Sequence, residues 1–389
     1  MCTSKILSFT SIRSDYDLMS GLYKMIHKDP DIELGLIVSG AHLSDTYGYT
    51  VRYIEKEGFP ILAKIESLID SNSTSSRIKS ASILLQNCIH TVESFKPDVI
   101  LFAGDREDMI VAALIGAYLK IPTIHFFGGD HASDGNVDNP VRHAVSKLAS
   151  LHLVSHESHA RRLKAIGEPD NRIFLIGNPA LDKFINEPWI TKKELLIKNS
   201  REDWVDYAIM IHHPILGNEE SSGKYFEEIL IALEDKQIKA FVGYPNTDAG
   251  NKQSLVCIRQ YEANPNFVFF ENLDRNLFVN LMRHAKLMIG NSSAGLIEAP
   301  MIPLGVVNVG ERQRGRMAAQ NVVFVDQGVE NIKSGIERVF SEEFQNNLQK
   351  IRSPYGEGNS VEKAFNLIKT IHLEKFRYKT EDPLSLNID

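Results

Sequence analysis

The chain has 389 residues, 43% of them hydrophobic, and its 43 basic and 50 acidic residues give a formal net charge of −7. That length exceeds one ordinary core and predicts two compact domains, and the acidic balance argues against broad nucleic-acid binding. No run approaches the roughly 20 apolar residues of a membrane span. The sequence opens without a signal peptide and its three cysteines form no CxxC pair, so a cytoplasmic protein without disulfides is expected.

In the first half, short runs rich in Ile, Val, Leu and Phe alternate with longer amphipathic segments. This alternation is typical of strand and helix units in a parallel sheet that helices cover on both faces. The expected strands are KILSF (5–9), IELGLIV (32–38), DVILFA (98–103), PTIHFF (122–127), LHLVS (151–155) and RIFLI (172–176).

The charged stretch 186–203 interrupts the alternation and indicates a domain boundary. We expect an N-terminal domain over residues 1–186, joined by a C-terminal helix at 361–375, and a C-terminal domain over 187–360. The last residues, 377–389, lack periodicity and are expected to form a loose tail. The strands expected in the second half are YAIMI (207–211), KAFVGYP (239–245), NFVFF (266–270), KLMIG (286–290), PLGVVNV (303–309) and NVVFV (321–325).

Polar residues follow almost every expected strand. Ligands of open α/β sheets bind beyond the carboxyl ends of the strands, so these residues are candidates for a site in a groove between the two domains. Each of them alone could be an ordinary solvated loop residue. They are Arg13, Asp15, His42, Asp105, Arg106 and Asp130 in the first half, and His212, His213, Asn246, Asp248, Asn291, Ser292 and Ser293 in the second.

Two motifs of the second half suit a phosphate. GNSSAGLIEAP (290–300) places two serines between a strand and a helix that is expected to carry Glu298, and the free N–H groups of a helix start bind phosphate. GERQRGR (310–316) sets three arginines on a loop, and guanidinium groups match phosphate oxygens. Taken singly, the first could be an N-cap and the second a solvated basic loop. Together they predict a diphosphate ligand.

The sequence lacks GxGxxG, Walker A, GxSxG and HExxH motifs. HESH at 156–159 offers two histidines at i and i+3, which could be a metal pair or the start of a helix with exposed side chains. The second interpretation is favoured because no third ligand is evident. Neither a metal nor a cofactor is expected.

Nine motifs occur along the chain in the order IRSDY (12–16), SGAHLSDTYG (39–48), GDRED (104–108), VDNPVRHAVSKLASLH (137–152), HHP (212–214), NTDAG (246–250), GNSSAGLIEA (290–299), GERQRGR (310–316) and YGEGN (355–359). This order is typical of UDP-N-acetylglucosamine 2-epimerases. Over roughly residues 5–372 the chain resembles that family, in particular its hydrolysing branch, which makes precursors of sialic or legionaminic acid.

The resemblance implies a GT-B-like α/β fold, in which two Rossmann-like, doubly wound parallel-sheet domains face a cleft and the second holds most of the nucleotide. It also implies a homodimer or dimer of dimers that binds a UDP-sugar. Residues similar to the family's nucleotide contacts are Arg13, Arg106, His213, Asn246, Ser292, Ser293, Glu298 and Arg312. Residues similar to its sugar end are His42, Asp105, His125, Asp138 and Arg142.

The sequence departs from the family at one position. The family often has a glutamate acid/base two residues after the histidine that corresponds to His125, but this chain has Phe127 there. A phenyl ring cannot move a proton, so either Asp105 or Asp130 takes over the role or the sugar differs. The expected catalytic residues are Asp105, Asp130, Asp138, Arg142 and His213.

The reaction that the resemblance implies begins with removal of the C2 proton as UDP departs from C1, which gives a glycal. Addition of water then yields N-acetylmannosamine, or the 2-epimer of a 2,4-diacetamido-2,4,6-trideoxy sugar. Gly128 and Gly129 are expected to let the backbone pass close to the sugar. The alternatives are a non-hydrolysing 2-epimerase, a GT-B glycosyltransferase and an inactive nucleotide-sugar-binding protein.

Overall fold

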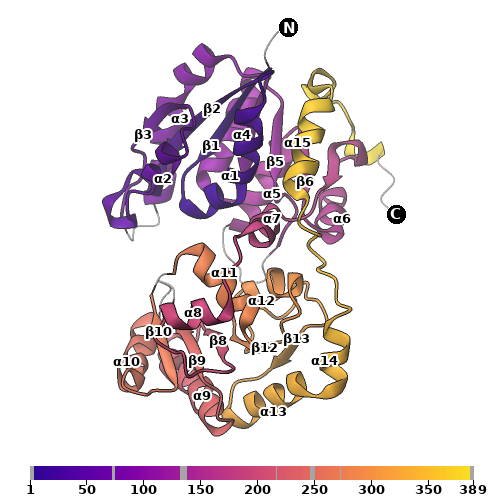
Figure 1. Cartoon of the computed structure of the whole chain (residues 1–389). Coiled ribbons are helices and arrows are strands. Elements are labelled where there is room, and N and C mark those ends of the chain that lie inside the picture. Colours follow the sequence, from indigo (N-terminus) through magenta and orange to yellow (C-terminus); the bar gives the residue numbers. More distant parts are fainter. Residues whose placement is uncertain are drawn as a thin grey trace. The chain divides into compact units, whose positions relative to one another are not determined.

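The computed structural model describes residues 4–71, 75–131, 138–215, 217–245, 250–271 and 273–385. The chain forms two compact units, one of Met1–Lys183 with Gly358–Asp389 and the other of Phe184–Glu357. The chain therefore crosses between the units twice, and its C-terminal part returns to the first unit (Figure 1).

The first unit contains a seven-stranded parallel sheet with the order β3-β2-β1-β4-β5-β6-β7. The order changes direction between β1 and β4, which is the switch point where ligands of such sheets bind. The strands are β1 (Ser4–Thr10), β2 (Ile32–Ser39), β3 (Ile61–Ile65), β4 (Val99–Ala103), β5 (Thr123–Phe126), β6 (Leu151–Val154) and β7 (Ile173–Leu175).

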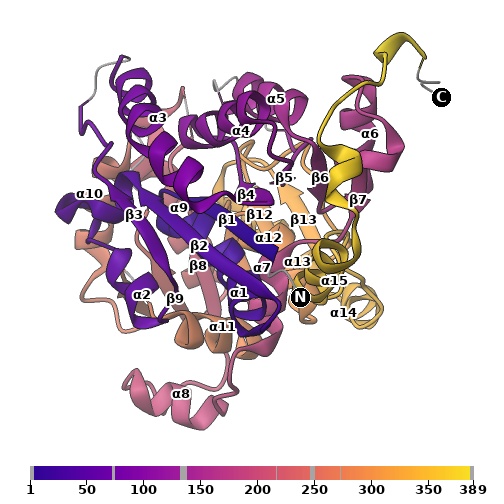
Figure 2. The ribbon, with the colours of Figure 1, turned by 90° about the horizontal axis from the view of Figure 1, so that it is seen from above.

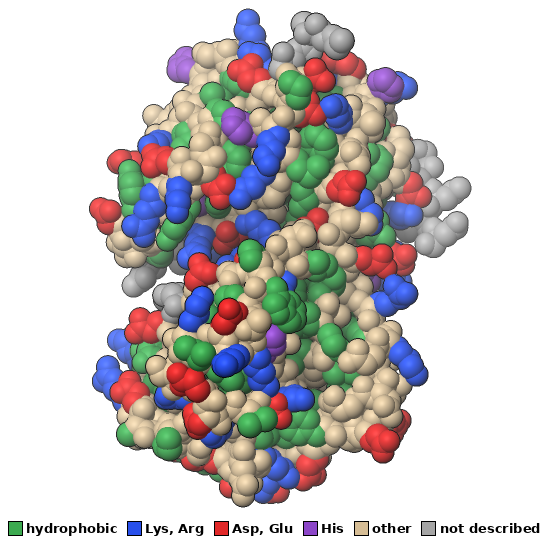
Figure 3. Space-filling view, in the orientation of Figure 1, with side chains coloured by type: hydrophobic (Ala, Val, Ile, Leu, Met, Phe, Trp, Pro, Cys, Tyr) green, Lys and Arg blue, Asp and Glu red, His purple; other side chains and the backbone are tan. Residues whose placement is uncertain are grey.

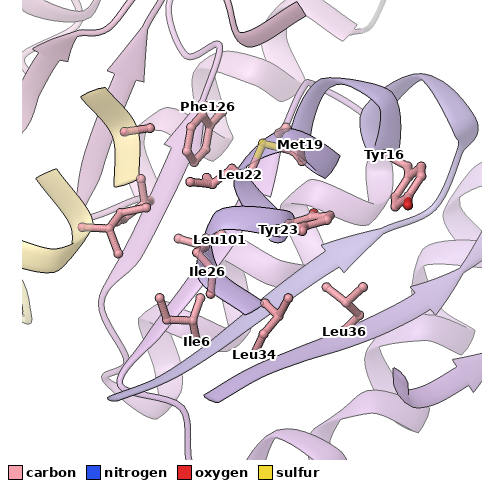
Figure 4. Close-up of a cluster of buried hydrophobic side chains, with 14 of the residues drawn as sticks. Ile6, Tyr16, Met19, Leu22, Tyr23, Ile26, Leu34, Leu36, Leu101 and Phe126 are labelled. Carbon is pink, nitrogen blue, oxygen red and sulfur yellow. The ribbon is translucent and has the colours of Figure 1, made fainter. Parts of the chain in front are cut away.

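Helices cover both faces of this sheet (Figure 2), with α1 and α15 on one face and α3, α4 and α5 on the other. The spacing of the buried residues along α1 turns one stripe of the helix toward the strands, and Figure 4 shows Tyr16, Met19, Leu22, Tyr23 and Ile26 on that side. The helices are α1 (Arg13–Lys28), α2 (Val51–Lys56), α3 (Ser76–Phe95), α4 (Glu107–Leu119), α5 (Asp138–Leu148), α6 (Glu157–Ala165), α7 (Pro179–Asn186) and α15 (Ser360–Thr370).

The second unit repeats this plan with a six-stranded parallel sheet of order β10-β9-β8-β11-β12-β13, whose switch point lies between β8 and β11. Helices α9, α10 and α13 pack on one face, and α8, α11 and α12 on the other. The strands are β8 (Ala208–Ile211), β9 (Ala240–Gly243), β10 (Phe267–Phe270), β11 (Leu287–Gly290), β12 (Val306–Val309) and β13 (Val322–Val325). The helices are α8 (Lys192–Lys198), α9 (Ser222–Asp235), α10 (Asn251–Tyr261), α11 (Arg275–His284), α12 (Ala294–Ile297), α13 (Val329–Phe340) and α14 (Glu342–Leu348).

The predicted α/β class with parallel sheets is confirmed, and each of the apolar runs predicted as a strand contains one. Strand β3 was not predicted. It lies at the edge of its sheet, and only Ile65 of its five residues is buried. A strand so exposed lacks the continuous apolar run that identifies central parallel strands.

The prediction of a loose C-terminal tail is wrong for residues up to Glu381. Arg172, which is only 1% exposed, donates from Nε (2.8 Å) and Nη2 (3.0 Å) to the Glu381 carboxylate. Lys379 donates to buried Glu168 (2.5 Å) and to the Lys147 carbonyl oxygen (2.9 Å). We call these five residues the tail network. It fastens the end of the chain to α5 and to the segment before β7.

Within the described ranges, no helix is long and apolar enough to cross a membrane. Basic and acidic side chains are interspersed on the face drawn in Figure 3.

Candidate active site

Two aspartates follow neighbouring strands of the first unit, Asp105 after β4 and Asp130 after β5. The guanidinium of Arg142, on α5, forms an ion pair with the Asp105 carboxylate. Arg142 is 8% exposed and also donates to Asn139 Oδ1 at 3.2 Å. The arginine is thus held on two sides, and this fixes the direction of the Asp105 carboxylate.

A second ion-pair cluster lies at the helix starts beside these strands. Arg77, on α3, places Nη2 2.9 Å from Asp138 Oδ1 and 2.6 Å from Glu107 Oε2. The two carboxylates stand in the first turns of α5 and α4, where the helix dipole favours negative charge. Arg77 therefore ties the start of α5, which carries Asp138 and Arg142, to the start of α4, which Arg106 precedes.

His42 lies inside the first unit. Its side chain is fully buried, with Nε2 3.0 Å from Thr10 Oγ1 and Nδ1 2.7 Å from Thr50 Oγ1. Asp15 lies beside it and accepts hydrogen bonds from Thr10 Oγ1 (2.5 Å) and from the backbone N–H of Ser11 (3.0 Å). His42 and Asp15 thereby brace the carboxyl end of β1.

Asp108 is a further carboxyl of this region. Burial, together with the charges of Glu107 and Asp15, raises its pKa to about 6, although Ser11 and Arg106 act in the opposite direction. A carboxyl with such a pKa exchanges a proton near neutral pH. The GDRED motif contains Asp108, but sequence analysis assigned roles only to Asp105 and Arg106.

His125 is also fully buried, and burial lowers its pKa to about 3. The ring is therefore neutral, and Nε2–H donates to the Gly104 carbonyl oxygen at 2.8 Å. Its Nδ1 lies 3.2 Å from Ser146 Oγ, on α5. His125 thus joins β5 to the residue before Asp105 and to the helix that carries Arg142.

The residues after β5 form a tight turn against neighbouring elements. Phe127 has a φ of 66° and packs against the core. A Cβ on Gly128 would lie 3.0 Å from His125 Nδ1, and a Cβ on Gly129, whose φ is 75°, would overlap the His159 carbonyl oxygen. These glycines were expected to let the backbone pass close to the sugar. In the structure they let it pass close to protein atoms instead.

The HESH motif starts α6. His156 is its N-cap and accepts a hydrogen bond from the Ser158 N–H at 3.0 Å, as the helix interpretation predicts. His159 is not exposed as that interpretation supposed. Its side chain is 8% exposed, and Nε2 lies 3.3 Å from Asp130 Oδ1.

In the second unit, Asn291 connects three of the predicted motifs. Its side chain accepts from the His213 N–H (2.7 Å) and donates to the His213 carbonyl oxygen (2.8 Å). Its own carbonyl oxygen accepts from Arg312 Nη1 (3.3 Å) and Gln313 Nε2 (3.1 Å). HHP, GNSS and GERQRGR therefore meet at the switch point between β8 and β11. His213 is the partly exposed histidine of its motif, since His212 is fully buried.

Ser292 and Ser293 are partly exposed at the same point, and Ser292 Oγ accepts from the Ala294 N–H at 3.3 Å. Helix α12 is a single turn that ends at Ile297, so Glu298 lies just after the helix that was expected to carry it. Glu298 is the C-cap of that turn. Its pKa is raised because the effect of burial exceeds the opposing effect of the Arg275 charge.

Two further predicted residues are exposed. Arg13, at the start of α1, is exposed, with its guanidinium 5.6 Å from the centre of the Tyr53 ring and Nε 3.6 Å from Asp17. Arg106 is exposed before α4. Asn246 and Asp248 lie outside the described residues.

The two doubly wound α/β units define a GT-B-like fold. A crystal structure of the UDP-GlcNAc 2-epimerase from Neisseria meningitidis, bound to UDP-GlcNAc, matches with a TM-score of 0.79 at 18% identity, covering 94% of this chain and 100% of that one.

The comparisons of sequence identify the family. The sequence model of the UDP-N-acetylglucosamine 2-epimerase family matches residues 24–369. The chain therefore belongs to that family. The UDP-N,N'-diacetylbacillosamine 2-epimerase (hydrolyzing) of Legionella pneumophila is 33% identical over 371 residues, covering 95% of this chain and 96% of that protein. The GDP/UDP-N,N'-diacetylbacillosamine 2-epimerase (hydrolyzing) of Campylobacter jejuni is 31% identical over 350 residues, covering 89% and 90%.

Proposed function

We propose that the protein is a hydrolysing 2-epimerase of a UDP-linked 2-acetamido sugar, which releases UDP and the free 2-epimer for sialic or legionaminic acid synthesis. The observation that carries the proposal is the set of carboxyl groups at the ends of β4 and β5 and the starts of α4 and α5. Epimerisation at C2 needs a base on one face of the sugar and an acid on the other, and Asp105, Asp130, Asp138 and Asp108 supply candidates.

In the proposed reaction, a carboxylate removes the C2 proton while the C1–O bond breaks and its electrons leave with the diphosphate. The product is a glycal. The oxygen of water then bonds to C1 while water loses a proton to a carboxylate, and a carboxylic acid returns a proton to C2 on the opposite face. Arg142 orients Asp105 for one of these transfers.

Charge that develops on the departing diphosphate needs fixed donors. The Asn291 cluster provides them in the second unit, because it gathers Arg312, His213 and the two partly exposed serines. Arg312 would bind the phosphate oxygens and His213 would donate to the leaving oxygen. No step of this scheme requires a metal.

Both relatives named above carry diacetylbacillosamine in their names, which favours a 2,4-diacetamido-2,4,6-trideoxy sugar over N-acetylglucosamine. Phe127 bears on the acid/base groups rather than on the identity of the sugar. It replaces the expected glutamate, and its ring packs against the core, so the acid/base role passes to other residues around the sugar.

The test is to incubate the protein in heavy water with UDP-N,N'-diacetylbacillosamine and, separately, with UDP-N-acetylglucosamine. Free UDP and a free 2-epimer with deuterium at C2 are the expected products. An epimeric nucleotide sugar would instead indicate the non-hydrolysing reaction, and bound but unchanged substrate an inactive binder. A free sugar without deuterium would rule out removal of the C2 proton.

A further inference from the structure

The turn after β5 is held from behind by α6. Arg162, on α6, donates to the Gly129 carbonyl oxygen, and Gly129 lies so close to the His159 carbonyl oxygen that a Cβ there would overlap it. The Phe127 N–H donates to the Leu153 carbonyl oxygen of β6 at 3.1 Å. Helix α6 and strand β6 therefore both contact the turn after β5, and α6 determines the position of Asp130.

Within this packing, His159 contacts the Asp130 carboxylate. Asp130 Oδ1 accepts from the His131 N–H at 2.8 Å and lies 3.3 Å from His159 Nε2. The Asp130 side chain is 30% exposed, whereas that of His159 is 8% exposed. The carboxylate therefore faces the solvent and the imidazole lies behind it.

The other ring nitrogen of His159 also has a partner. Nδ1 lies 3.2 Å from Ser155 Oγ. Ser155 therefore contacts the ring on the side away from Asp130, and the contact of Nε2 with the carboxylate is an ion pair when the ring is protonated. His156, whose ring centre lies 6.0 Å from that of His159, and Arg162, one turn along α6, lie beside this pair.

We propose that His159 is a positioning residue for Asp130, and that the Ser155–His159–Asp130 series sets the direction of a carboxyl group that exchanges a proton with the sugar. The proposal rests on the proposed 2-epimerase function. His159 itself lies behind the carboxylate and transfers no proton to the substrate.

The test compares His159→Phe, which keeps a ring but removes Nε2–H, with His159→Gln, which keeps an N–H near the same place. We expect His159→Phe to lower kcat by up to ~10²-fold, the usual cost of a misplaced reacting group. His159→Gln should restore most of the lost rate. Affinity for UDP, measured by calorimetry, should not change in either variant.

Two further variants separate this role from simple packing. Arg162→Met removes the hydrogen bond from α6 to the Gly129 carbonyl oxygen and should lower kcat less than His159→Phe does. In the Asp130→Asn background, His159→Phe should cause no further loss of kcat, since it acts through the carboxylate. Equal losses of kcat from His159→Phe in both backgrounds, or a His159→Gln variant as slow as His159→Phe, would overturn the proposal. A wild-type protein that releases no UDP would instead refute the proposed function.

Discussion

Glu168 is the residue whose replacement tests the tail network most directly. Its side chain is fully buried, accepts from His152 Nε2 at 2.8 Å, and forms ion pairs with Lys147 Nζ at 2.7 Å and Lys379 Nζ at 2.5 Å. Glu168→Gln keeps the shape of the side chain but removes its charge. The change leaves two lysines without a counter-charge beside α5, the helix that carries Arg142.

The size of the effect follows from the pKa of Glu168. Burial would raise it, but the hydrogen bond from His152 and the charges of the neighbouring groups outweigh burial and lower the pKa from 4.5 to about 2. At about 1.4 kcal/mol for each pKa unit, the lowering of the Glu168 pKa adds about 3 kcal/mol to the free energy of unfolding at neutral pH. The figure agrees with the roughly 3–5 kcal/mol lost when a buried ion pair is broken.

The assay is urea denaturation of the wild type and of Glu168→Gln from pH 7 to pH 2, with Glu362→Gln, an exposed glutamate of α15, as the control. Because the pKa is lowered in the folded state, the stabilisation is present above about pH 4.5 and is lost as the pH falls toward 2. The difference between wild type and variant should therefore shrink over that range. A variant as stable at pH 7 as the control would refute the reasoning.

Three other predictions follow from the site. Asp105→Asn keeps the shape of the carboxylate but cannot exchange a proton, so turnover should fall ~10²–10⁴-fold while calorimetry shows unchanged UDP affinity; retained turnover would assign Asp105 a structural role. Arg312→Ala should weaken UDP binding by roughly 1.5–3 kcal/mol, the usual value of a charge-assisted hydrogen bond, and calorimetry with unchanged affinity would remove its phosphate role. Gly129→Ala should destabilise the protein by at least about 1–3 kcal/mol, and clearly more than Gly58→Ala, because Gly58 has a nearly equal φ of 76° but open space around it; equal losses in thermal denaturation would show that α6 does not require the glycine.

Structural features that depend on a run of consecutive residues could be predicted from the sequence. Central strands such as β4 and β11 are continuous apolar runs, and the polar residues after them are placed at one edge of the sheet by parallel topology alone. The convergence of HHP, GNSS and GERQRGR follows from the same rule, because β8, β11 and β12 are neighbours.

Contacts between residues far apart in the chain could not be predicted in this way. Arg77 and Asp138 are 61 residues apart, and Lys379 and Glu168 are 211 apart. Neither pair leaves a periodic signal in the sequence, because a single side chain reaching from one element to another changes no pattern. His159 was visible in the HESH motif, but its i, i+3 spacing from His156 indicated either a metal pair or a helix start, and only the packing of α6 on Gly129 brings it to Asp130.

The contacts described above that direct the candidate groups each lie within one unit. Arg142 holds Asp105 from α5, His159 contacts Asp130 from α6, and both helices belong to the unit that contains the two aspartates. Asn291 gathers His213 and Arg312 within the other unit. Because each set is held by its own sheet and helices, a substitution in one set should leave the geometry of the other unchanged. Proton transfer and UDP affinity are therefore expected to be separable by mutation, so that His159 variants change kcat alone and Arg312 variants change UDP affinity.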